Sequence, residues 1–311
     1  MATSIIPHEA RRSIRAASAF LGALTGDAAA QTSHWNYDRA AYHKALKHGG
    51  RFDSPEFFES NQFYVQPVGL QSCYGDQMVE IARHLAQLVD GRSSKDDVVA
   101  GLTSVDGQEA LIGRFVKAFG SSSAYGSWLT PSERESNPPP RPDMPIAGPW
   151  RHGSLKGFLD NVSEGQGTIP ESGSDDSQFD AVARSIPVVC AFAGDPRLLE
   201  LVEIVVRLTQ NTDIAVAYAR LAARILESII LGVATDVPSA LRMAIDAENA
   251  DLDANTDSGD QCKARHEACV MLNIVSEILE LEPPSFEEAV AALGSDKAMK
   301  EYLSSPVSIV A

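Results

Sequence analysis

Apolar residues recur at helical spacing in four long stretches of the chain. Each stripe steps by three or four positions, which places its side chains on one face of an α-helix that can pack against a core. Alternating patterns typical of β-strands are scarce. The pattern therefore predicts an all-α fold, carried by Met78, Ile81, Leu85 and Leu88; by Leu198, Val202, Val205 and Leu208; by Ile214, Tyr218, Leu221, Ile225 and Ile229; and by Ala268, Met271, Val275 and Ile278.

A fifth apolar stripe lies near the N-terminus, with arginines on the opposite face. It predicts a first helix of the folded protein, although the arginines and serines leave a mitochondrial transit peptide as the alternative. The stripe consists of Ile14, Ala17, Phe20, Leu21 and Leu24.

Short polar residues mark expected helix ends. Asp195 followed by Pro196 is typical of an N-cap with proline at the first helical position. Ser285 and Glu288 have the spacing of a capping box, and Gly294 is placed to end the helix that they would begin.

Three stretches interrupt the helical pattern. Residues 120–150 are rich in proline and serine and predict a long, helix-free internal loop. Residues 163–177 have the Gly, Ser and Asp content of a surface loop, and an acidic break is expected at 246–260. The helices on both sides of the long loop have wide apolar faces that need partners. We therefore expect one compact helical domain over 1–311, with its core at about 14–292 and a divergent tail at 294–311.

Charge changes the range of expected partners. The chain has 42 Asp and Glu against 26 Lys and Arg, a formal net charge of −16. Nucleic-acid binders carry a basic face, because neutralising phosphates supplies most of their affinity. In addition, no stretch approaches the ~20 apolar residues that span a bilayer. We expect a soluble protein with neither a nucleic-acid nor a membrane partner.

Cysteine usage points to a reducing compartment. Four cysteines in 311 residues do not make a disulfide framework. Cys262 and Cys269 share a helix face, but they lack the C-x-x-C spacing and paired histidines of a zinc site. Free, buried or partly buried thiols and a cytoplasmic location are the expectation.

Three segments place a carboxylate at an expected helix boundary, in what we predict to be tight turns. They contain Asp27 after Gly26, Asp76 after Gly75, and Asp213 after Thr212. Such residues cap helices and favour the helix dipole. Alternatively, carboxylates from several helix ends can converge on hard cations, which take oxygen ligands. Spacing alone leaves both interpretations open.

Several strings beyond these turns resemble the ADP-ribosylglycohydrolase family, in its branch that contains the jellyfish J1-crystallins and selenoprotein J. Ser-Cys-Tyr-Gly-Asp-Gln and Gly-Pro-Trp-Arg-His are the distinctive ones. The resemblance covers roughly residues 14–292, and its matching stretches are 26–30, 34–38, 61–64, 72–77, 148–152 and the helical pattern from 179 to 232.

The resemblance implies an all-helical fold that holds two Mg²⁺ ions in a cleft and hydrolyses the bond between ADP-ribose and a protein side chain or related acceptor. It implies that Asp76 and Asp213 are catalytic, and that Asp76, Gln77 and Asp213 lie at the metal positions. Asp27, with the nearby His34 and Trp35, would frame the ribose or adenine, and Arg151 could hold a phosphate. For Trp35 a core position is the alternative, and for Arg151 an anchoring role at the end of the long loop.

The chain departs from the family pattern where the metals would bind. Active members have Thr-Asp-Asp where this chain has Gly75-Asp76-Gln77, so that one carboxylate is replaced by a neutral amide. The C-terminal Asp-x-Asp turn of the family has only Asp296 as a weak counterpart. Mg²⁺ releases its waters reluctantly and would bind weakly to so few carboxylates. We therefore expect a hydrolase with an eroded metal site; the alternatives are a catalytically inactive, crystallin-like structural protein and an ADP-ribose-binding module.

Overall fold

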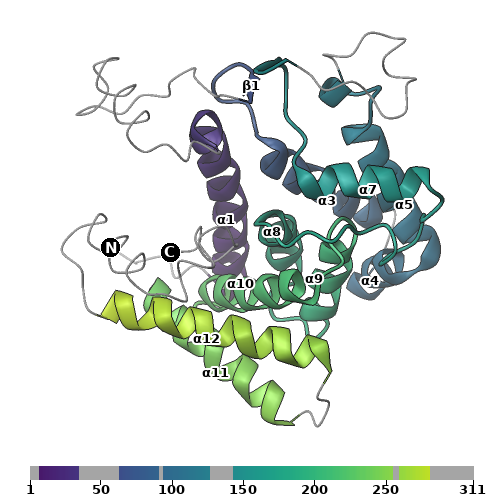
Figure 1. Ribbon diagram of the computed structural model, residues 1–311. Coiled ribbons are helices and arrows are strands. Elements are labelled where there is room, and N and C mark those ends of the chain that lie inside the picture. The colour runs from purple at the N-terminus through teal and green to yellow at the C-terminus, as the bar shows by residue number, and fades with distance from the viewer. Residues whose placement is uncertain (1–6, 35–62, 91–93, 127–142, 255–258, 281–311) are drawn as a thin grey trace, which may run out of the picture.

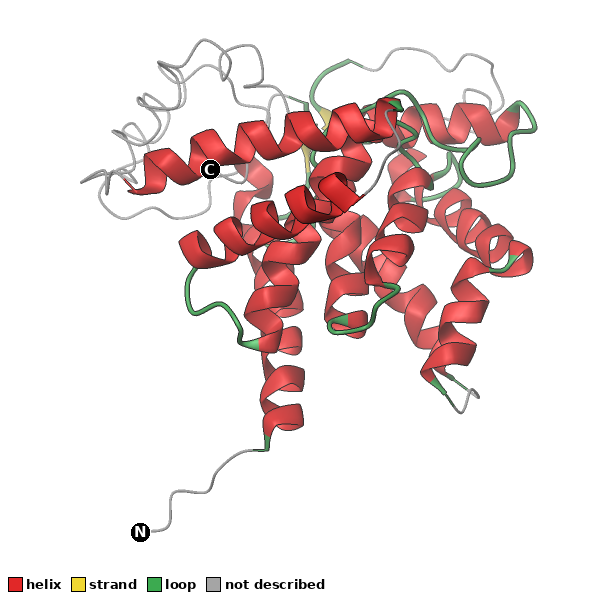
Figure 2. Ribbon diagram, turned by 90° about the horizontal axis from the view of Figure 1, so that it is seen from below, coloured by secondary structure: helices red, strands yellow, loops and turns green. Residues whose placement is uncertain are grey.

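The computed structural model describes residues 7–34, 63–90, 94–126, 143–254 and 259–280. Helices make up most of this part of the chain (Figures 1 and 2), which confirms the predicted all-α class. The α-helices are α1 (His8–Ala30), α3 (Cys73–Val89), α4 (Lys95–Thr103), α5 (Val105–Phe119), α7 (Gly153–Ser163), α8 (Asp180–Phe192), α9 (Leu198–Arg207), α10 (Asp213–Leu231), α11 (Val237–Ala254) and α12 (Asp260–Glu280). Among the described residues no helix is both long and apolar enough to cross a membrane.

Helix α8 lies at the centre and packs against α1, α3, α9 and α10 (Figure 1). One apolar cluster extends from α3, α4 and α5 through α8 and α9 to α10, with Phe115, Leu201 and Val205 almost wholly buried. A second cluster joins the other face of α10 to α11 and α12, around Leu221 and Leu272. The four predicted stripes supply side chains to these two clusters. Helix α10 contributes residues to both clusters.

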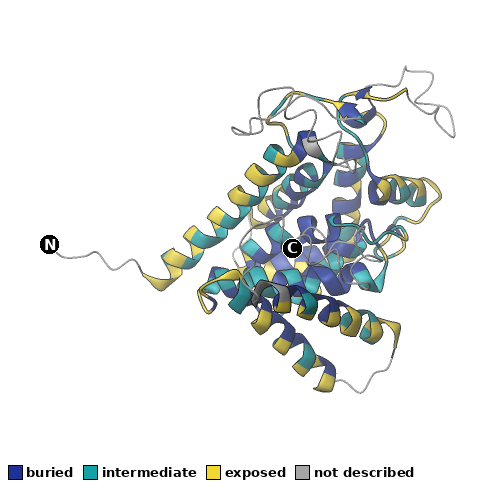
Figure 3. Ribbon diagram, turned by 60° about the vertical axis from the view of Figure 1, so that its left-hand side comes forward, coloured by how far each residue is buried: buried dark blue, intermediate teal, exposed yellow. Residues whose placement is uncertain are grey.

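Helix α1 packs with only part of the face that the stripe predicted, because Phe20 and Leu24 are half-buried but the other stripe residues are exposed. Ile14 and Leu21 are 55% and 61% exposed, and no residue of α1 is fully buried (Figure 3). The contact face includes small residues, Ala16 and Ala19, which let the helices approach closely. Arg15, expected on the outer face, donates from Nε to the carbonyl of Ile230 at 2.6 Å, near the C-terminus of α10.

The predicted acidic break at 246–260 was wrong over its first half, because α11 continues to Ala254. Glu248 is buried between three helices and accepts from Arg220 at 3.2 Å, Arg224 at 2.7 Å and Arg265 at 2.5 Å. Burial alone would raise the pKa of Glu248, but the three guanidinium groups outweigh it and the pKa lies below its usual value. An apparently solvated acidic segment thus joins α10, α11 and α12.

The other interruptions are more ordered than their composition suggested. The described ends of the 120–150 loop contain a 3₁₀ turn (η2, Ala124–Gly126) and a short strand (β2, Ile146–Ala147), which pairs in parallel with β1 (Tyr64–Val65). Within the 163–177 loop Ser172 is buried, and its hydroxyl donates to the carbonyl of Leu208 at 2.9 Å. Compact turns and single buried hydroxyls leave no periodic signal in the sequence.

One of the predicted helix ends, at Asp195, can be compared with the structure. Helix α9 begins at Leu198, three residues after the predicted cap. Asp195 instead accepts from the backbone N–H of Arg197 at 3.0 Å and pairs with the Arg197 guanidinium. The predicted helix at Ser285, its end at Gly294 and the tail at 294–311 lie outside the described residues.

Candidate functional site

The C-terminal end of α1 meets the start of α3 through the carboxylate of Asp27. One Asp27 oxygen accepts from the backbone N–H of Ser72 at 2.7 Å, and the other accepts from the Ser72 hydroxyl at 2.5 Å. The Ser72 hydroxyl oxygen accepts in turn from the backbone N–H of Tyr74 at 3.1 Å and caps α3. Ser72, and not the predicted Asp76, is therefore the residue that caps α3, and Asp27 is the acceptor that orients this cap.

Asp27 itself does not lie in a glycine turn, as the sequence suggested. It projects from the last turns of α1, and Gly26 is not among the glycines with positive φ. Alanine has the highest helix propensity of all residues, and the following Ala28, Ala29 and Ala30 continue the helix through Gly26.

Asp76 lies in the first turn of α3, where its carboxylate accepts from the Tyr125 hydroxyl at 2.7 Å. Partial burial raises the pKa of Asp76 to about 6; the Tyr125 hydrogen bond lowers it, and the neighbouring Asp27 and Glu80 raise it. Burial also raises the pKa of Asp27, against the hydrogen bonds from Ser72. A partly accessible carboxyl that titrates close to neutrality is suited to general acid–base chemistry.

Gln77, next to Asp76, points into the protein interior toward Arg184, which is fully buried. Arg184 donates from Nη1 to Gln77 Oε1 at 2.6 Å and to Asp180 at 3.1 Å, and from Nη2 to Gln210 Oε1 at 2.7 Å. Its remaining hydrogen bonds go to two backbone carbonyls at the end of α9. This network, which we call the Arg184 cluster, joins α3, α8, α9 and the segment before α10.

The amide nitrogen of Gln77 is engaged as well. It donates to the carbonyl of Cys73 at 3.0 Å and lies 3.1 Å from Nε2 of His152. The His152 ring stacks on Tyr74, with 4.6 Å between the ring centroids. Both ends of the Gln77 amide therefore take part in the buried network at the base of the site.

Sequence reasoning missed the acidic members of this region. Asp180 is fully buried beside Arg184, and Asp176 accepts from Gln210 Nε2 at 2.8 Å and from the backbone N–H of Gln178 at 2.9 Å. Burial and the nearby Asp180 raise the pKa of Asp176. A signal was available, because Asp180 and Arg184 are an oppositely charged pair one turn apart in an otherwise apolar helix.

Asp213 lies in the first turn of α10, after Thr212, whose hydroxyl oxygen accepts from the backbone N–H of Ala215 at 3.4 Å. The capping interpretation is confirmed here. The Asp213 carboxylate pairs with Arg207 at 2.7 Å, and Arg207 also pairs with Glu203 at 2.7 Å. Asp213 thus shares the single positive charge of Arg207 with Glu203.

A two-metal centre needs several oxygen ligands that converge. Among the residues that the structure describes, no three His, Cys, Asp or Glu side chains form a group that could hold a metal. Asp27 is engaged by Ser72 and Asp213 by Arg207, while Asp76 accepts from Tyr125. The described residues therefore do not fit two Mg²⁺ ions. Asp296 lies outside the described residues.

The expected ribose-binding pair is described only in part. His34 is half-buried, with its ring edge-on to Tyr74 at 5.5 Å between centroids. Burial, and to a smaller extent His152, lowers the pKa of His34 to about 4, so the imidazole is neutral at pH 7. Trp35 lies outside the described residues, and its role stays a prediction.

Arg151 is half-buried, within electrostatic range of Tyr125, whose hydroxyl group binds Asp76. Its Nε and Nη2 are buried and have no hydrogen-bond partner in the described part of the chain. Trp150 packs near Phe63, and the Lys156 ammonium lies 3.9 Å from the centre of the Trp150 ring. Burial, followed by the charge of Arg151, lowers the pKa of Lys156. Two neighbouring cations, one with unused guanidinium donors, suit a phosphate group.

Comparison with known proteins gives a consistent result. A family model described as ADP-ribosylglycohydrolase matches residues 8–306. Crystallin J1A of Tripedalia cystophora is 29% identical over 219 residues, and Crystallin J1B of the same animal is 28% identical over 219 residues. Each match covers 70% of this chain but only 58% of the crystallin, so the chain spans less than two thirds of these relatives. No solved structure matches.

The Arg184 cluster predicts a large stability effect. Replacing Arg184 with methionine leaves the buried Asp180 carboxylate without its cation, and we expect the free energy of unfolding to fall by about 3–5 kcal/mol. Urea denaturation measures this. Arg83→Met, whose side chain is 64% exposed, is the matched control and should change stability by less than about 1 kcal/mol. Equal midpoints for the two variants would contradict a central role for Arg184.

The raised pKa of Asp76 predicts a pH-dependent effect of Asp76→Asn. The carboxyl binds its proton more tightly in the folded than in the unfolded protein, so wild-type stability falls as pH rises from the usual value of 3.8 to about 6. The Asn variant lacks this loss. At pH 7 we expect it to be more stable by on the order of 1–2 kcal/mol, with little difference near pH 4. A stability gain that is equal at both pH values would contradict the shift.

Proposed function

The chain belongs to the ADP-ribosylglycohydrolase family, and we propose that it is a slow hydrolase of the bond linking ADP-ribose to a protein side chain. The family is generally metal-dependent and acts on ADP-ribosylated substrates. The observation that carries the proposal is Asp76, a partly buried carboxyl with a pKa of about 6, beside Asp27 where α1 and α3 meet. Such a group can accept or donate a proton under cellular conditions.

The proposed roles follow from the surroundings of each group. Asp76 acts as the acid–base residue, with Tyr125 holding its carboxylate. Asp27, fixed by two hydrogen bonds to Ser72, and the neutral His34 frame the ribose together with Trp35. A hydrogen-bonded carboxylate and a neutral imidazole can both accept from the hydroxyl groups of a sugar.

Arg151 takes a phosphate of the ADP-ribosyl group in this proposal. Its guanidinium has unused donors, and Lys156 adds a second positive charge nearby. Asp213 would be the second catalytic carboxylate, although its ion pair with Arg207 must open first. The cost of opening that pair is one reason to expect slow turnover.

We assign no step to Mg²⁺, because the described donors do not fit a two-metal centre. By family resemblance, Gln77 occupies a position where a metal ligand is expected. Its side-chain amide, however, already contacts Arg184, Cys73 and His152. We propose that the ion, if present, binds weakly at this position.

A non-catalytic role is the second candidate. Both relatives are named crystallins, and a structural protein that is packed at high concentration must stay soluble. A net charge of −16 opposes self-association. On this alternative the fold serves as a structural protein or an ADP-ribose-binding module without turnover.

Release of ADP-ribose from ADP-ribosylated proteins, measured with and without Mg²⁺, separates the two candidates. We expect detectable release that rises as Asp76 ionises between pH 5 and 7, and that falls roughly 100-fold or more in Asp76→Asn. Glu267→Gln, an exposed carboxylate on α12, should retain the wild-type rate. No release at high protein concentration, with Asp76→Asn behaving like the wild type, would leave the non-catalytic role.

Calorimetric titration with free ADP-ribose tests the phosphate contact. We expect Arg151→Gln to weaken binding by about ten-fold or more, because a charge-assisted hydrogen bond contributes about 1.5–3 kcal/mol. Arg11→Gln, on the exposed side of α1, is the control and should bind like the wild type. Unchanged binding in Arg151→Gln would show that Arg151 only anchors the end of the long loop.

A further inference from the structure

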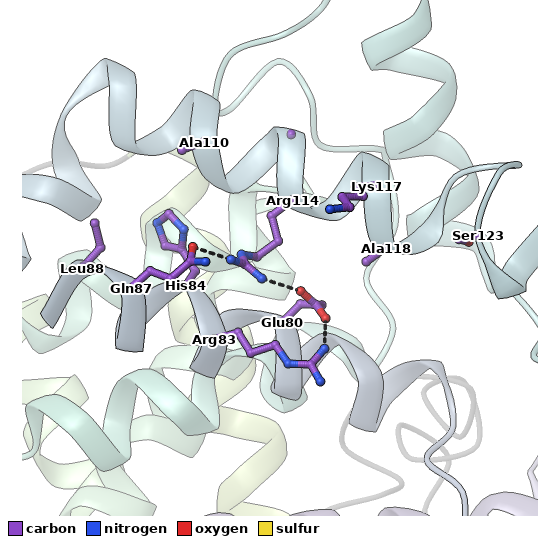
Figure 4. Close-up of a pocket in the computed structure, with 11 residues that line it drawn as sticks. Glu80, Arg83, His84, Gln87, Leu88, Ala110, Arg114, Lys117, Ala118 and Ser123 are labelled. Atoms are coloured by element: carbon purple, nitrogen blue, oxygen red, sulfur yellow. Dashed lines mark hydrogen bonds and ion pairs between the residues drawn. The ribbon is translucent and has the colours of Figure 1, made fainter. Parts of the chain in front are cut away.

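A groove of about 650 Å³ runs between α3 and α5 and adjoins the Asp27–Asp76 site through Glu80, whose charge raises the pKa of Asp76. Figure 4 shows side chains from both helices facing this space. Its volume is in the range of pockets that hold small organic ligands. Asp27, Asp76 and Arg151 are not among its lining residues.

The groove is lined by more positive than negative charge. Arg83, Arg114 and Lys117 face a single carboxylate, Glu80. Both arginines already bind that carboxylate, at 2.6 Å from Arg83 and 2.9 Å from Arg114 (Figure 4). Gln87 accepts a further hydrogen bond from Arg114. Since Glu80 can neutralise only one of the three cations, the groove keeps a net positive charge in a chain whose net charge is −16.

The two cations of α5 lie close together along this groove. The Nη groups of Arg114 bind Glu80 and Gln87, and its Nε is buried and lacks a hydrogen-bond partner in the described part of the chain. In Figure 4 the amine of Lys117 extends along the groove in the direction of Arg114. Arg114 and Lys117 lie on the same face of α5, one turn apart.

The rest of the lining is mostly apolar, and His84 and Ser123 are its remaining polar residues. Leu88, Ala110 and Ala118 supply the apolar contacts. Gly113 lies in the middle of α5, and a Cβ placed there would meet no atom within 4 Å. A small ligand can therefore combine charge pairing with contact against a smooth helix surface.

We propose that the α3–α5 groove binds a small phosphorylated ligand, at a site distinct from the one proposed for ADP-ribosyl groups. The planar guanidinium fork matches the oxygens of a phosphate, and Lys117 adds a point charge. An acidic partner protein would place many like charges against the negative surface of this chain, whereas a small ligand brings its charge only to the groove.

The test locates binding directly. The full chain is titrated with sodium pyrophosphate at constant ionic strength, and hydrogen–deuterium exchange is followed in peptides that cover residues 80–88 and 110–118. We expect saturable protection of both segments. Lys117→Gln should weaken the apparent affinity about five-fold, and Gly113→Leu, whose side chain would fill the groove, should weaken it at least ten-fold.

Gly113→Leu is a favourable blocking variant, because the folded protein has space for the new side chain and leucine has a higher helix propensity than glycine. Its urea midpoint should equal or exceed that of the wild type. Gly22→Leu, at an exposed helical glycine with equally open surroundings, is the control and should bind like the wild type.

The proposal is overturned if the wild type shows no saturable protection at millimolar pyrophosphate, or if Gly113→Leu binds as tightly as the wild type. A poly-glutamate peptide that binds the groove more tightly than pyrophosphate would also overturn it.

Discussion

The buried guanidinium of Arg184 fixes the arrangement on which the rest of this protein depends. A charge without access to water must be neutralised and its donors satisfied, or it costs several kcal/mol. Its acceptors come from α3, α8, the end of α9 and Gln210, which are far apart in the sequence. Each of these elements must therefore hold one register relative to α8. Apolar packing alone would tolerate small shifts, but a forked donor set with five acceptors does not.

The same constraint explains the character of the site. Because Gln77 accepts from Arg184, its side chain faces inward, and Asp76 is left as the carboxyl at the start of α3 that is accessible to a ligand. Asp180 neutralises Arg184 from within the core, so its charge does not contribute a free ligand position. The negative charge that could attract a cation is thus largely committed to holding the fold together. Burial, and for Asp76 also the nearby charge of Asp27, raises the pKa of both partly accessible carboxyl groups.

Much of the fold could be predicted from the sequence, because helical periodicity is a local property. The stripes through Ile81, Val205 and Leu221 all lie on helices, and Asp76 and Asp213 lie in the first turns of helices, as predicted. The prediction failed where tertiary contacts decide. Glu248 belongs to a segment of loop-like composition, yet three arginines from two other helices hold it in place. Likewise, the stripe of α1 identified only part of the buried face, since close approach favours alanine over leucine there.

Helix α1 has few buried contacts, and this affects how often Asp27 is in place at the site. This helix buries no residue fully and is held mainly by small contacts, by Arg15 near one end and by Asp27 near the other. Segments with few buried apolar contacts open locally at a lower free energy than the whole domain. Each such excursion would carry Asp27 away from Ser72 while α3 and α8 stay folded. The half of the site contributed by α1 would thus be present only for the fraction of time that the helix is closed, and a ligand bound across the junction would stabilise that closed state.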